Sequence, residues 1–600
     1  MCGISAFIGH NVYTSIYSSL LKLRNRGYDS AGILTYINDI WKVNKYANED
    51  AFELLRPDQP DDRFGVGIGH TRWATHGAKT DANAHPHVDQ YNQFGLVHNG
   101  IIENYEEIKL FLSKHHYTFC SETDSEVIVQ LLSFYSSHCS STEEALQKVV
   151  SELEGTYALC ILSKVDPNTI FFLRKGSPLL LGHDENKKKY MLVSEVDGFD
   201  SSITHYTVIE NNDCCRINLV DQTIKVKRTG TSPFQKLHHS LHQWTPDPYP
   251  HWTLKEIMEQ QQISQKVLCN FSRIHEDKVV LGGLEKIKSK VLSYSHMVLL
   301  GCGTSFFAAK SCVHLFRSVI ETVVAFDAGE VVEEDLPHHP FLCVCISQSG
   351  ETKDVYDKIN MLKRKGGLLL GVINVVDSYI AREMDAGIYL HVGKEVGVAS
   401  TKSFTAQVMA LHLMACFLYQ NKGLATQTWI QNLMVVEKQI EYVIQRNHEG
   451  CKSLAQHLIK SSHLFILGKG KYISYAEEGC LKIKEIGYIH AEAYGSSSLK
   501  HGPYALIENG TPIILLVPQD ENFTKHQSVK EEVLGRGAQV IGISDGPLDS
   551  KYTVSFLVPK SSFFGVLSNI ILQLLAYELS VAKGINPDMP RNLAKVVTVD

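Results

Sequence analysis

The sequence has few of the features that mark nucleic-acid-binding or secreted proteins. Its 600 residues carry 58 lysines and arginines against 65 aspartates and glutamates, a formal net charge of −7, and no long basic run. Nucleic acid is therefore not an expected partner. The N-terminus lacks a basic region followed by an apolar core, so we expect no signal peptide.

Long apolar runs and metal-type cysteine spacings are scarce as well. Residues 367–376 fall short of the roughly 18 residues that cross a membrane, and polar side chains interrupt residues 563–579. We expect a cytoplasmic protein without a membrane partner. The 14 cysteines include two tight pairs, at 214–215 and 343–345, and neither has a second pair at zinc-like spacing. This predicts reduced thiols and no metal site. The loop Gly-x-x-x-x-Gly-Lys-Ser/Thr is also missing, which argues against ATP use.

The pattern of the chain changes near its middle. From residue 1 to 235, short apolar runs alternate with turn signals and a few helical stretches, which is typical of a sheet-on-sheet core with covering helices. Residues 236–252 include Pro246, Pro248 and Pro250. Proline at this density blocks helices and central strands and predicts a linker. From residue 253 strands and helices alternate, which predicts parallel α/β structure.

The α/β part contains an internal repeat. The stretch Met297-Val-Leu-Leu-Gly-Cys-Gly303 resembles Leu464-Phe-Ile-Leu-Gly-Lys-Gly470, and two further apolar runs recur at a similar offset, close to 170 residues. We therefore expect two doubly wound parallel α/β domains, at 253–450 and 451–600, joined by a helical stretch at about 425–460.

One strand-to-helix turn of the first repeat is built like a phosphate site. It reads Ser347-Gln348-Ser349-Gly350-Glu351-Thr352. Hydroxyls and outward-pointing N–H groups at a helix start bind phosphate, and ligands of such sheets bind at this end of the strands. An ordinary Ser/Thr-rich cap remains the alternative. The matching turn of the second repeat, residues 518–522, is acidic and lacks the glycine, which favours a single sugar-phosphate site. Residues 301–305, which follow another strand, would complete it.

Three charged or titratable groups follow in the second repeat. Lys482 and Glu485 lie three apart on one helix face, His501 precedes Gly-Pro in a turn, and Lys595 lies close to the C-terminus. Each has an ordinary alternative as well: a solvated ion pair, a structural turn and an exposed tail.

The first part of the chain offers a nucleophile. Removal of Met1 would leave Cys2 with an α-amine of reference pKa roughly 7.7–8.0 beside its thiol, and that amine is a built-in base. The alternative is that Cys2 is an ordinary small second residue without a catalytic role. Arg72 is suited to grip a carboxylate, and Asn99 with the N–H of Gly100 to form an oxyanion hole. Asp124 is either a helix N-cap or the acceptor for a substrate ammonium.

Together these motifs resemble one family. The stretches 2–4, 26–32, 71–77 and 98–101 resemble the glutaminase domain of the N-terminal-nucleophile amidotransferases, and the stretches 347–352, 398–402, 500–503 and 591–595 resemble the paired sugar-isomerase (SIS) domains. Their order along the whole chain is similar to that of the isomerising glutamine–fructose-6-phosphate aminotransferases. The fold class implied is an N-terminal α+β glutaminase domain of αββα type at 1–235, followed by the linker and two SIS domains.

The resemblance also assigns roles in the glutaminase half. Cys2 attacks glutamine, Arg72 binds its carboxylate and Asp124 its ammonium, and Asn99 with Gly100 stabilises the oxyanion. Thr75 and His76 line the pocket, and Trp73 gates an ammonia channel. Fructose 6-phosphate is the acceptor substrate.

In the isomerase half, His501 opens the sugar ring from the partner subunit of a homodimer. Glu485 moves the proton from C1 to C2, with Lys482 as helper, and Lys595 is a Schiff-base or charge-stabilising lysine. No cofactor is implied. The residues expected to bind the sugar or its phosphate are Cys302, Gly303, Thr304, Ser305, Ser347, Gln348, Ser349, Thr352, Val398 and Ala399.

Some positions depart from the family's pattern, namely Glu195, Gln261, Ser497 and Ser498, and none of them removes a proposed catalytic group. Two other readings stay open. A different amidotransferase would need a diphosphate loop or an ATP site, and neither is found. A sugar-phosphate sensor would bind without turnover, and would leave Glu485, His501 and Lys595 without a reason to coexist.

Overall fold

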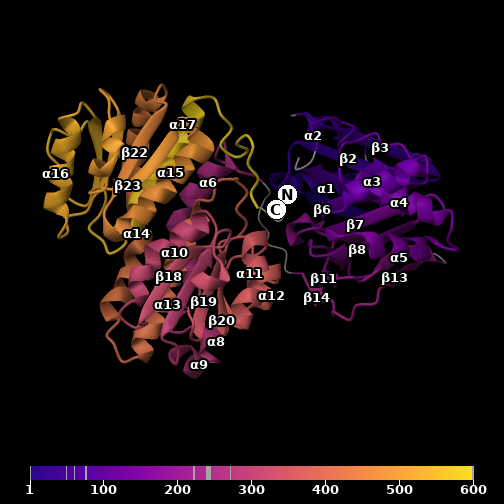
Figure 1. The fold of residues 1–600 in the computed structure, drawn as a ribbon, viewed down its shortest axis with the longest axis horizontal. Helices are drawn as coiled ribbons and strands as arrows, with labels where there is room; N and C mark the ends of the chain where they lie inside the picture. The colour runs from indigo at the N-terminus through magenta and orange to yellow at the C-terminus, as the bar shows by residue number, and fades with distance from the viewer. Residues whose placement is uncertain are drawn as a thin grey trace. The chain divides into compact units, whose positions relative to one another are not determined.

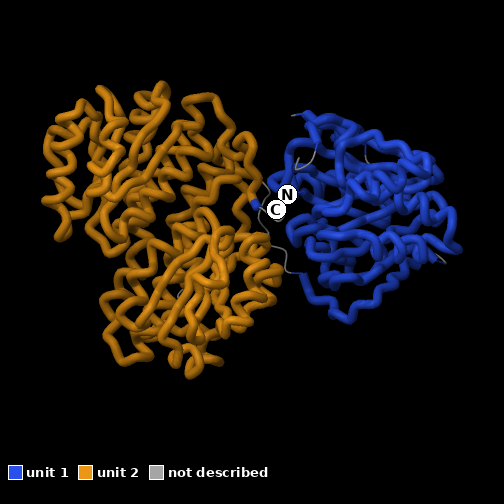
Figure 2. The backbone as a smooth tube through the Cα atoms, in the orientation of Figure 1, with its two compact units in different colours: residues 1–244, 596–600 blue, residues 245–595 orange. Residues whose placement is uncertain are grey.

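The computed structural model describes residues 2–48, 50–59, 61–73, 77–220, 223–237, 245–269 and 272–596. The chain divides into two compact units, residues 1–244 with 596–600, and residues 245–595, coloured separately in Figure 2. Part of the expected linker, residues 238–244, lies outside the described residues. The helix α6 (Trp252–Met258) begins at its other end.

Unit 1 is built on two facing antiparallel sheets. One has eight strands in the order β14-β11-β9-β10-β1-β4-β2-β3 and the other six in the order β13-β12-β8-β7-β6-β5. The strands of the first are β1 (Gly3–His10), β2 (Ser30–Ile37), β3 (Ile40–Tyr46), β4 (Phe64–Arg72), β9 (Leu180–His183), β10 (Tyr190–Val193), β11 (His205–Val208) and β14 (Gln235–Lys236). Those of the second are β5 (His87–Val88), β6 (Phe94–Ile102), β7 (Gly155–Ser163), β8 (Thr169–Lys175), β12 (Cys215–Val220) and β13 (Thr223–Lys227).

Alternation along β1 explains the layering of unit 1. Ile4, Ala6 and Ile8 point between the sheets and pack against the second sheet, whereas Phe7 points outward, as the period of two in a strand requires. The outer face of the first sheet is covered by α1 (Val12–Lys22), beside the short α2 (Ala51–Leu54). The second is covered by α3 (Tyr105–Lys114), α4 (Glu126–Ser136) and α5 (Thr142–Glu152). The layers are therefore αββα, as expected.

Unit 2 contains two parallel five-stranded sheets of the same strand order, β18-β17-β19-β20-β21 and β23-β22-β24-β25-β26. The first sheet has β17 (His296–Gly301), β18 (Thr322–Asp327), β19 (Phe341–Ser347), β20 (Gly367–Ile373) and β21 (Ala386–Tyr389). The second has β22 (His463–Gly468), β23 (His490–Gly495), β24 (Pro512–Val517), β25 (Gln539–Ser544) and β26 (Val554–Leu557). The predicted repeat and the doubly wound α/β class are confirmed.

Helices cover both sheets of unit 2 (Figure 1). They are α10 (Thr304–Phe316), α11 (Lys353–Arg364), α12 (Tyr379–Glu383), α13 (Lys402–Asn421), α15 (Ile473–Gly487), α16 (Phe523–Leu534) and α17 (Phe564–Ala582), with α14 (Gln427–Leu458) joining the repeats. Before the first sheet come α7 (Ile263–Val267), the hairpin β15 (Ile274–His275) and β16 (Lys278–Val279), α8 (Gly282–Glu285) and α9 (Lys288–Leu292). By length and composition α17 would be able to cross a membrane, but 94% of its apolar window is buried inside the fold, as for a core helix.

Candidate active sites

The thiol of Cys2 lies at the start of β1, next to the end of β4. The backbone N–H of Gly3 donates to Thr71 Oγ1 at 3.0 Å, which fixes the turn into the strand. The N–H of Trp73 points at the sulfur, with N and Sγ 3.3 Å apart. The sulfur also lies 3.7 Å from the carbonyl oxygen of Trp73. The half-buried Cys2 is therefore placed as a nucleophile requires.

The expected oxyanion donors lie on β6, in the opposite sheet. Asn99 Nδ2 donates to the carbonyl of Cys2 at 2.9 Å, which brings the amide to the nucleophile. Gly100 has a φ of +138°, and a Cβ there would lie 2.0 Å from the carbonyl oxygen of Thr156. Only glycine fits this position. Asn99 and Cys2 are thus brought together as predicted, and Gly100 lies next along β6.

Arg72 and Asp124 are both buried in the same region. Burial lowers the pKa of the Arg72 guanidinium, while Cys2, Asp29 and Asp124 oppose this through their charges. Asp124 Oδ2 accepts the N–H of Ile102 at 2.9 Å, and α4 begins only at Glu126, with Ser125 as its flanking residue. The N-cap alternative for Asp124 is therefore wrong. A buried cation and a buried carboxylate within Coulombic range suit the two ends of an amino acid.

Two predicted pocket residues, Thr75 and His76, lie outside the described residues. Trp73 is described, and its ring meets that of Tyr28 edge-on, with centroids 5.5 Å apart.

In unit 2 the predicted phosphate turn is preorganised by its own hydroxyls. Ser347 Oγ accepts the N–H of Gly350 at 2.9 Å and lies 3.2 Å from Thr352 Oγ1, while Ser349 Oγ accepts the N–H of Glu351. Thr352 immediately precedes α11. The neighbouring parallel strand β17 ends at the same edge and leads to Ser305, whose hydroxyl accepts from Gln407 at 3.0 Å. The edge therefore offers the hydroxyls and N–H groups that a phosphate needs.

The start of α10 meets the end of α15 at a buried charged cluster. Lys482 Nζ lies 2.6 Å from Glu485 Oε2 and donates to Thr304 Oγ1 at 3.0 Å. The predicted sharing of a helix face by Lys482 and Glu485 is confirmed. Their contact with Thr304 joins the two repeats, and the ordinary reading as a solvated ion pair fails because Lys482 is fully buried.

The C-terminal tail reaches the loop that precedes α13. Lys595 Nζ lies 2.6 Å from Glu395 Oε2 and donates to Ser400 Oγ at 3.2 Å, so the reading as an exposed tail is wrong for this side chain. The N–H of Val398 donates to the carbonyl of Asp588 at 3.2 Å. Tail and loop are thus fixed to one another beside Val398 and Ala399.

His501 is not joined to this cluster. It is exposed on the turn η6 (Leu499–His501), and its imidazole makes no hydrogen bond or ion pair with another described residue. Cys302 and Gly303 precede α10 as expected. Burial, with Asp327 and Asp354, raises the pKa of Cys302 to about 12, which makes its thiol unreactive. The described part of the chain contains no group of three or more metal-type ligands.

Two family models match the chain. A glutamine amidotransferase domain matches residues 70–201, and a SIS domain matches residues 291–416 and 457–583. A probable glutamine–fructose-6-phosphate aminotransferase (isomerizing) of Acanthamoeba polyphaga mimivirus is 39% identical, and such an enzyme of Thermococcus kodakarensis is 35% identical, each with 100% of both chains covered. The chain belongs to the isomerising glutamine–fructose-6-phosphate aminotransferase family.

A solved structure supports the membership for unit 2. The C-terminal domain of glucosamine-fructose-6-phosphate aminotransferase from Francisella tularensis is 30% identical, with a TM-score of 0.53, and it covers 58% of this chain and 100% of that one.

Three buried acids of this aminotransferase-family chain were not predicted. Glu478 Oε1 accepts from Thr304 Oγ1 at 3.2 Å and lies 3.4 Å from Lys482 Nζ. Glu395 holds Lys595, and Glu256 on α6 accepts the N–H of Val396 at 2.5 Å. A signal existed for Glu478, which lies four residues before Lys482 and on the same helix face. Glu256 and Glu395 had no such signal, because Val396 lies 140 residues from Glu256 and Lys595 lies 200 residues from Glu395.

Two of the four departures from the family's pattern have side-chain partners. Glu195 pairs with Arg26 at 3.0 Å, and Ser497 Oγ accepts from Lys469 at 2.7 Å. Neither contact involves a candidate catalytic group.

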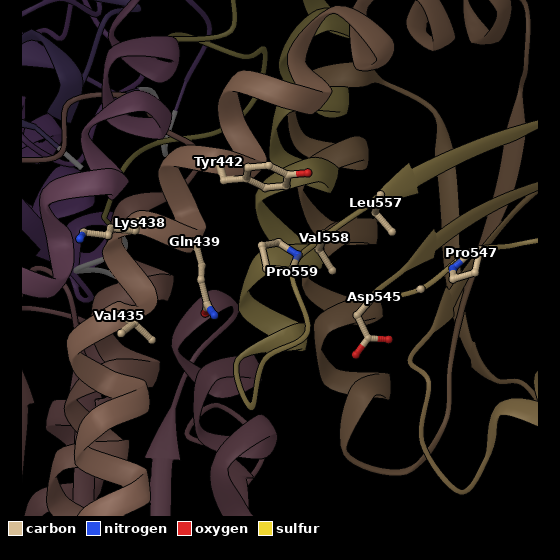
Figure 3. Close-up of a pocket in the computed structure, with 10 residues that line it drawn as sticks. Val435, Lys438, Gln439, Tyr442, Asp545, Pro547, Leu557, Val558 and Pro559 are labelled. Atoms are coloured by element: carbon tan, nitrogen blue, oxygen red, sulfur yellow. The ribbon is translucent and has the colours of Figure 1, made fainter.

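A cavity of about 650 Å³ in unit 2 is separate from these residues. Figure 3 shows Tyr442 of α14 facing the loops that follow β25 and β26. Asp545 projects from one of these loops, and its carboxylate would repel a phosphate. None of the predicted site residues lines the cavity.

Proposed function

We propose that this protein converts D-fructose 6-phosphate and L-glutamine into D-glucosamine 6-phosphate and L-glutamate, the first step of hexosamine synthesis. The observation that carries the proposal is the presence of two different centres in one chain. One has Cys2, whose backbone carbonyl accepts from the amide of Asn99, and the other has Lys482, which pairs with Glu485 and donates to Thr304. A glutaminase alone would not need the second centre, and an isomerase alone would not need the first.

In the first half-reaction, the α-amine of Cys2 takes the thiol proton and the thiolate attacks the side-chain amide carbon of glutamine. Arg72 and Asp124 hold the carboxylate and ammonium of the substrate. Asn99 Nδ2 and the Gly100 N–H stabilise the oxyanion. The α-ammonium then passes its proton to the substrate nitrogen, and collapse of the tetrahedral intermediate expels ammonia and leaves a thioester, which water converts into glutamate and the free thiol. Thr75 and His76 contribute to the glutamine pocket.

In the second half-reaction, the phosphate of fructose 6-phosphate binds the hydroxyls and N–H groups of Ser305 and of residues 347–352. His501 opens the ring, and ammonia adds to the C2 carbonyl with loss of water. Glu485 then removes a proton from C1 and returns one to C2, which gives the aldose 2-amino sugar. Lys482, held at 2.6 Å from Glu485, assists the transfer, and Lys595 acts as Schiff-base or charge-stabilising lysine.

The proposal extends to the surroundings of the two centres. His501, which is exposed in this chain, enters the sugar site of a partner in a homodimer. Ammonia passes from Cys2 to the sugar within the protein, with Trp73 as the gate. The enzyme works in the cytoplasm, without metal, organic cofactor, nucleic-acid or membrane partner.

The test is incubation of the purified protein, with Met1 removed, in glutamine and fructose 6-phosphate, followed by detection of glucosamine 6-phosphate and glutamate in equal amounts. Glutamate without amino sugar would point to a different amidotransferase. Tight binding of fructose 6-phosphate without any turnover would identify a sugar-phosphate sensor. Either result would overturn the proposal.

A further inference from the structure

His70 on β4 makes two hydrogen bonds that play no part in the glutaminase mechanism proposed above. The side chain is fully buried between the two sheets of unit 1. Its Nε2 lies 3.0 Å from Asn99 Oδ1 and 3.0 Å from the carbonyl oxygen of His98. One ring nitrogen therefore reaches across the sheets to the side chain that also contacts Cys2.

The two partners determine where the proton of His70 lies. A carbonyl oxygen and an amide oxygen only accept hydrogen bonds, so Nε2 carries the hydrogen and donates to both. Burial lowers the pKa of His70 to about 3, although the bonds to Asn99 and His98 oppose this. The ring is therefore neutral at physiological pH, and Nδ1, which has no hydrogen-bond partner among the described residues, is unprotonated.

The orientation of the Asn99 amide follows from this donor. An asparagine amide can turn by 180° and exchange its oxygen with its nitrogen. With Oδ1 held by His70, Nδ2 faces Cys2 and donates to its carbonyl at 2.9 Å, and its second hydrogen is available to the substrate. The reversed amide would set its oxygen against the carbonyl oxygen of Cys2 and present a partial negative charge to an oxyanion. It would also leave the His70 donor facing an NH₂ group.

We propose that His70 is a positioning residue of the glutaminase reaction, whose Nε2–H holds Asn99 in the one orientation that stabilises the oxyanion. The proposal rests on the proposed role of Asn99 as an oxyanion donor. His70 itself touches neither substrate nor Cys2 and acts through Asn99 alone. A donor that acts this way affects the charged tetrahedral intermediate and leaves the binding of glutamine unchanged.

The test compares two variants in which an amide N–H replaces the imidazole N–H of His70 at two different distances from the backbone. In His70→Gln the side-chain nitrogen extends about as far as Nε2, whereas in His70→Asn it extends only as far as Nδ1. The full-length protein is assayed for glutamine hydrolysis and for inhibition by glutamate γ-semialdehyde, which forms a tetrahedral adduct with the thiol. Inhibition by glutamate, which binds without forming an adduct, is measured in parallel.

For His70→Asn we expect kcat for glutamine hydrolysis to fall by about 10²–10³, with a similar loss of affinity for the aldehyde. The KM for glutamine and the inhibition constant of glutamate should change by less than about threefold, because ground-state binding does not use the oxyanion hole. His70→Gln should recover most of the loss. Equal weakening of aldehyde and glutamate binding would show a merely structural role and overturn the proposal, as would an unchanged kcat.

A double-mutant cycle keeps the test decisive if His70→Asn is poorly stable. Added to Asn99→Ala, His70→Gln and His70→Asn should cause no further loss in kcat, because the residue through which His70 acts is gone. Additive losses would overturn the proposal. If Asn99→Ala alone left kcat unchanged, the oxyanion role of Asn99 in the proposed function would be wrong, which is a distinguishable result. Thermal unfolding of each full-length variant, compared with the wild type, reports whether unit 1 is folded, because the sugar centre lies in unit 2 and does not report on it.

Discussion

The ammonium of Lys595 lies 2.6 Å from the carboxylate of Glu395, with side-chain exposures of 2% and 0%. Glu395 also accepts the N–H groups of Thr401 and Ser403 and the hydroxyl of Ser403. Burial disfavours its ionisation, but Lys595 and these donors lower its pKa to about 2. Glu395 is therefore ionised at neutral pH, and Lys595, five positions from the C-terminus, is fixed beside the loop that precedes α13.

Replacement of Glu395 by alanine should destabilise unit 2 by about 3–5 kcal/mol, because Lys595 and the donors that Glu395 accepts would lose a buried partner. Calorimetric or denaturant unfolding of the full chain measures this loss. Conversion of fructose 6-phosphate should fall as well, while hydrolysis of glutamine at Cys2 persists.

The matched control removes both charges. In Glu395→Gln with Lys595→Met no buried charge is left unpaired, so stability should recover relative to Glu395→Ala, although catalysis does not. A single Glu395→Ala variant as stable as the wild type would show that the pair contributes nothing to the fold.

Glu478 predicts a pH dependence of stability. Burial is the main cause that raises its pKa from 4.5 to about 8; Glu485 adds to it, while Lys482 and Thr304 oppose it. The folded state thus holds this proton more tightly than the unfolded chain. The stabilisation is complete below pH 4.5 and is lost as the pH rises through about 8. In this window the group lowers the free energy of unfolding by up to about 1.4 kcal/mol per pH unit.

Glu478→Gln keeps an acceptor for Thr304 but cannot ionise. Its free energy of unfolding should therefore fall less steeply than that of the wild type between pH 5 and pH 8, as measured by denaturant titration at several pH values. Parallel curves for the two proteins would mean that Glu478 does not change its proton occupancy in this range.

Local pattern was sufficient to predict most of the fold. The apolar residues of β1 and of the three recurring strands of unit 2 are buried on one or both faces of a sheet. Such burial produces an apolar pattern that is visible in the sequence itself. The turn at 347–352 could also be predicted from the sequence, because its hydroxyls form hydrogen bonds within six residues of the chain.

Contacts between distant segments were not predictable. Glu256 bonds Val396 across 140 residues, and Glu395 pairs with Lys595 across 200. The local sequence around an acidic residue in a helix or loop is the same whether its side chain is solvated or buried. Tertiary packing alone determines whether the side chain is buried. The interpretation of Asp124 as an N-cap failed for a related reason. Its oxygen bonds the neighbouring strand at Ile102, and the helix begins two residues later.

Gly100→Ala should impair the glutaminase centre selectively. The new Cβ would lie 2.0 Å from the carbonyl oxygen of Thr156, at a φ of +138° that L-residues rarely adopt. We expect a loss of about 1–3 kcal/mol or more in the stability of unit 1 and a strong fall in glutamine hydrolysis. Gly303 provides the control, since its φ is also positive but a Cβ there meets nothing within 4 Å. If Gly303→Ala destabilised the protein equally, the loss of stability in Gly100→Ala would come from backbone strain alone and not from the clash with Thr156.

Cys2→Ala should separate the two half-reactions. The variant lacks the nucleophile, so hydrolysis of glutamine should fall to the background rate, and no glucosamine 6-phosphate should form from glutamine. Glu485, Lys482 and Thr304 lie in the other unit and keep their contacts. Conversion of fructose 6-phosphate into glucose 6-phosphate, followed by a coupled assay, should therefore remain at about the wild-type rate. Glu485→Gln should give the opposite result, with glutamine hydrolysis retained and isomerisation lost. If Cys2→Ala abolished both activities in a folded protein, the proton transfers of the sugar would depend on the thiol, and the assignment of two separate centres would be wrong.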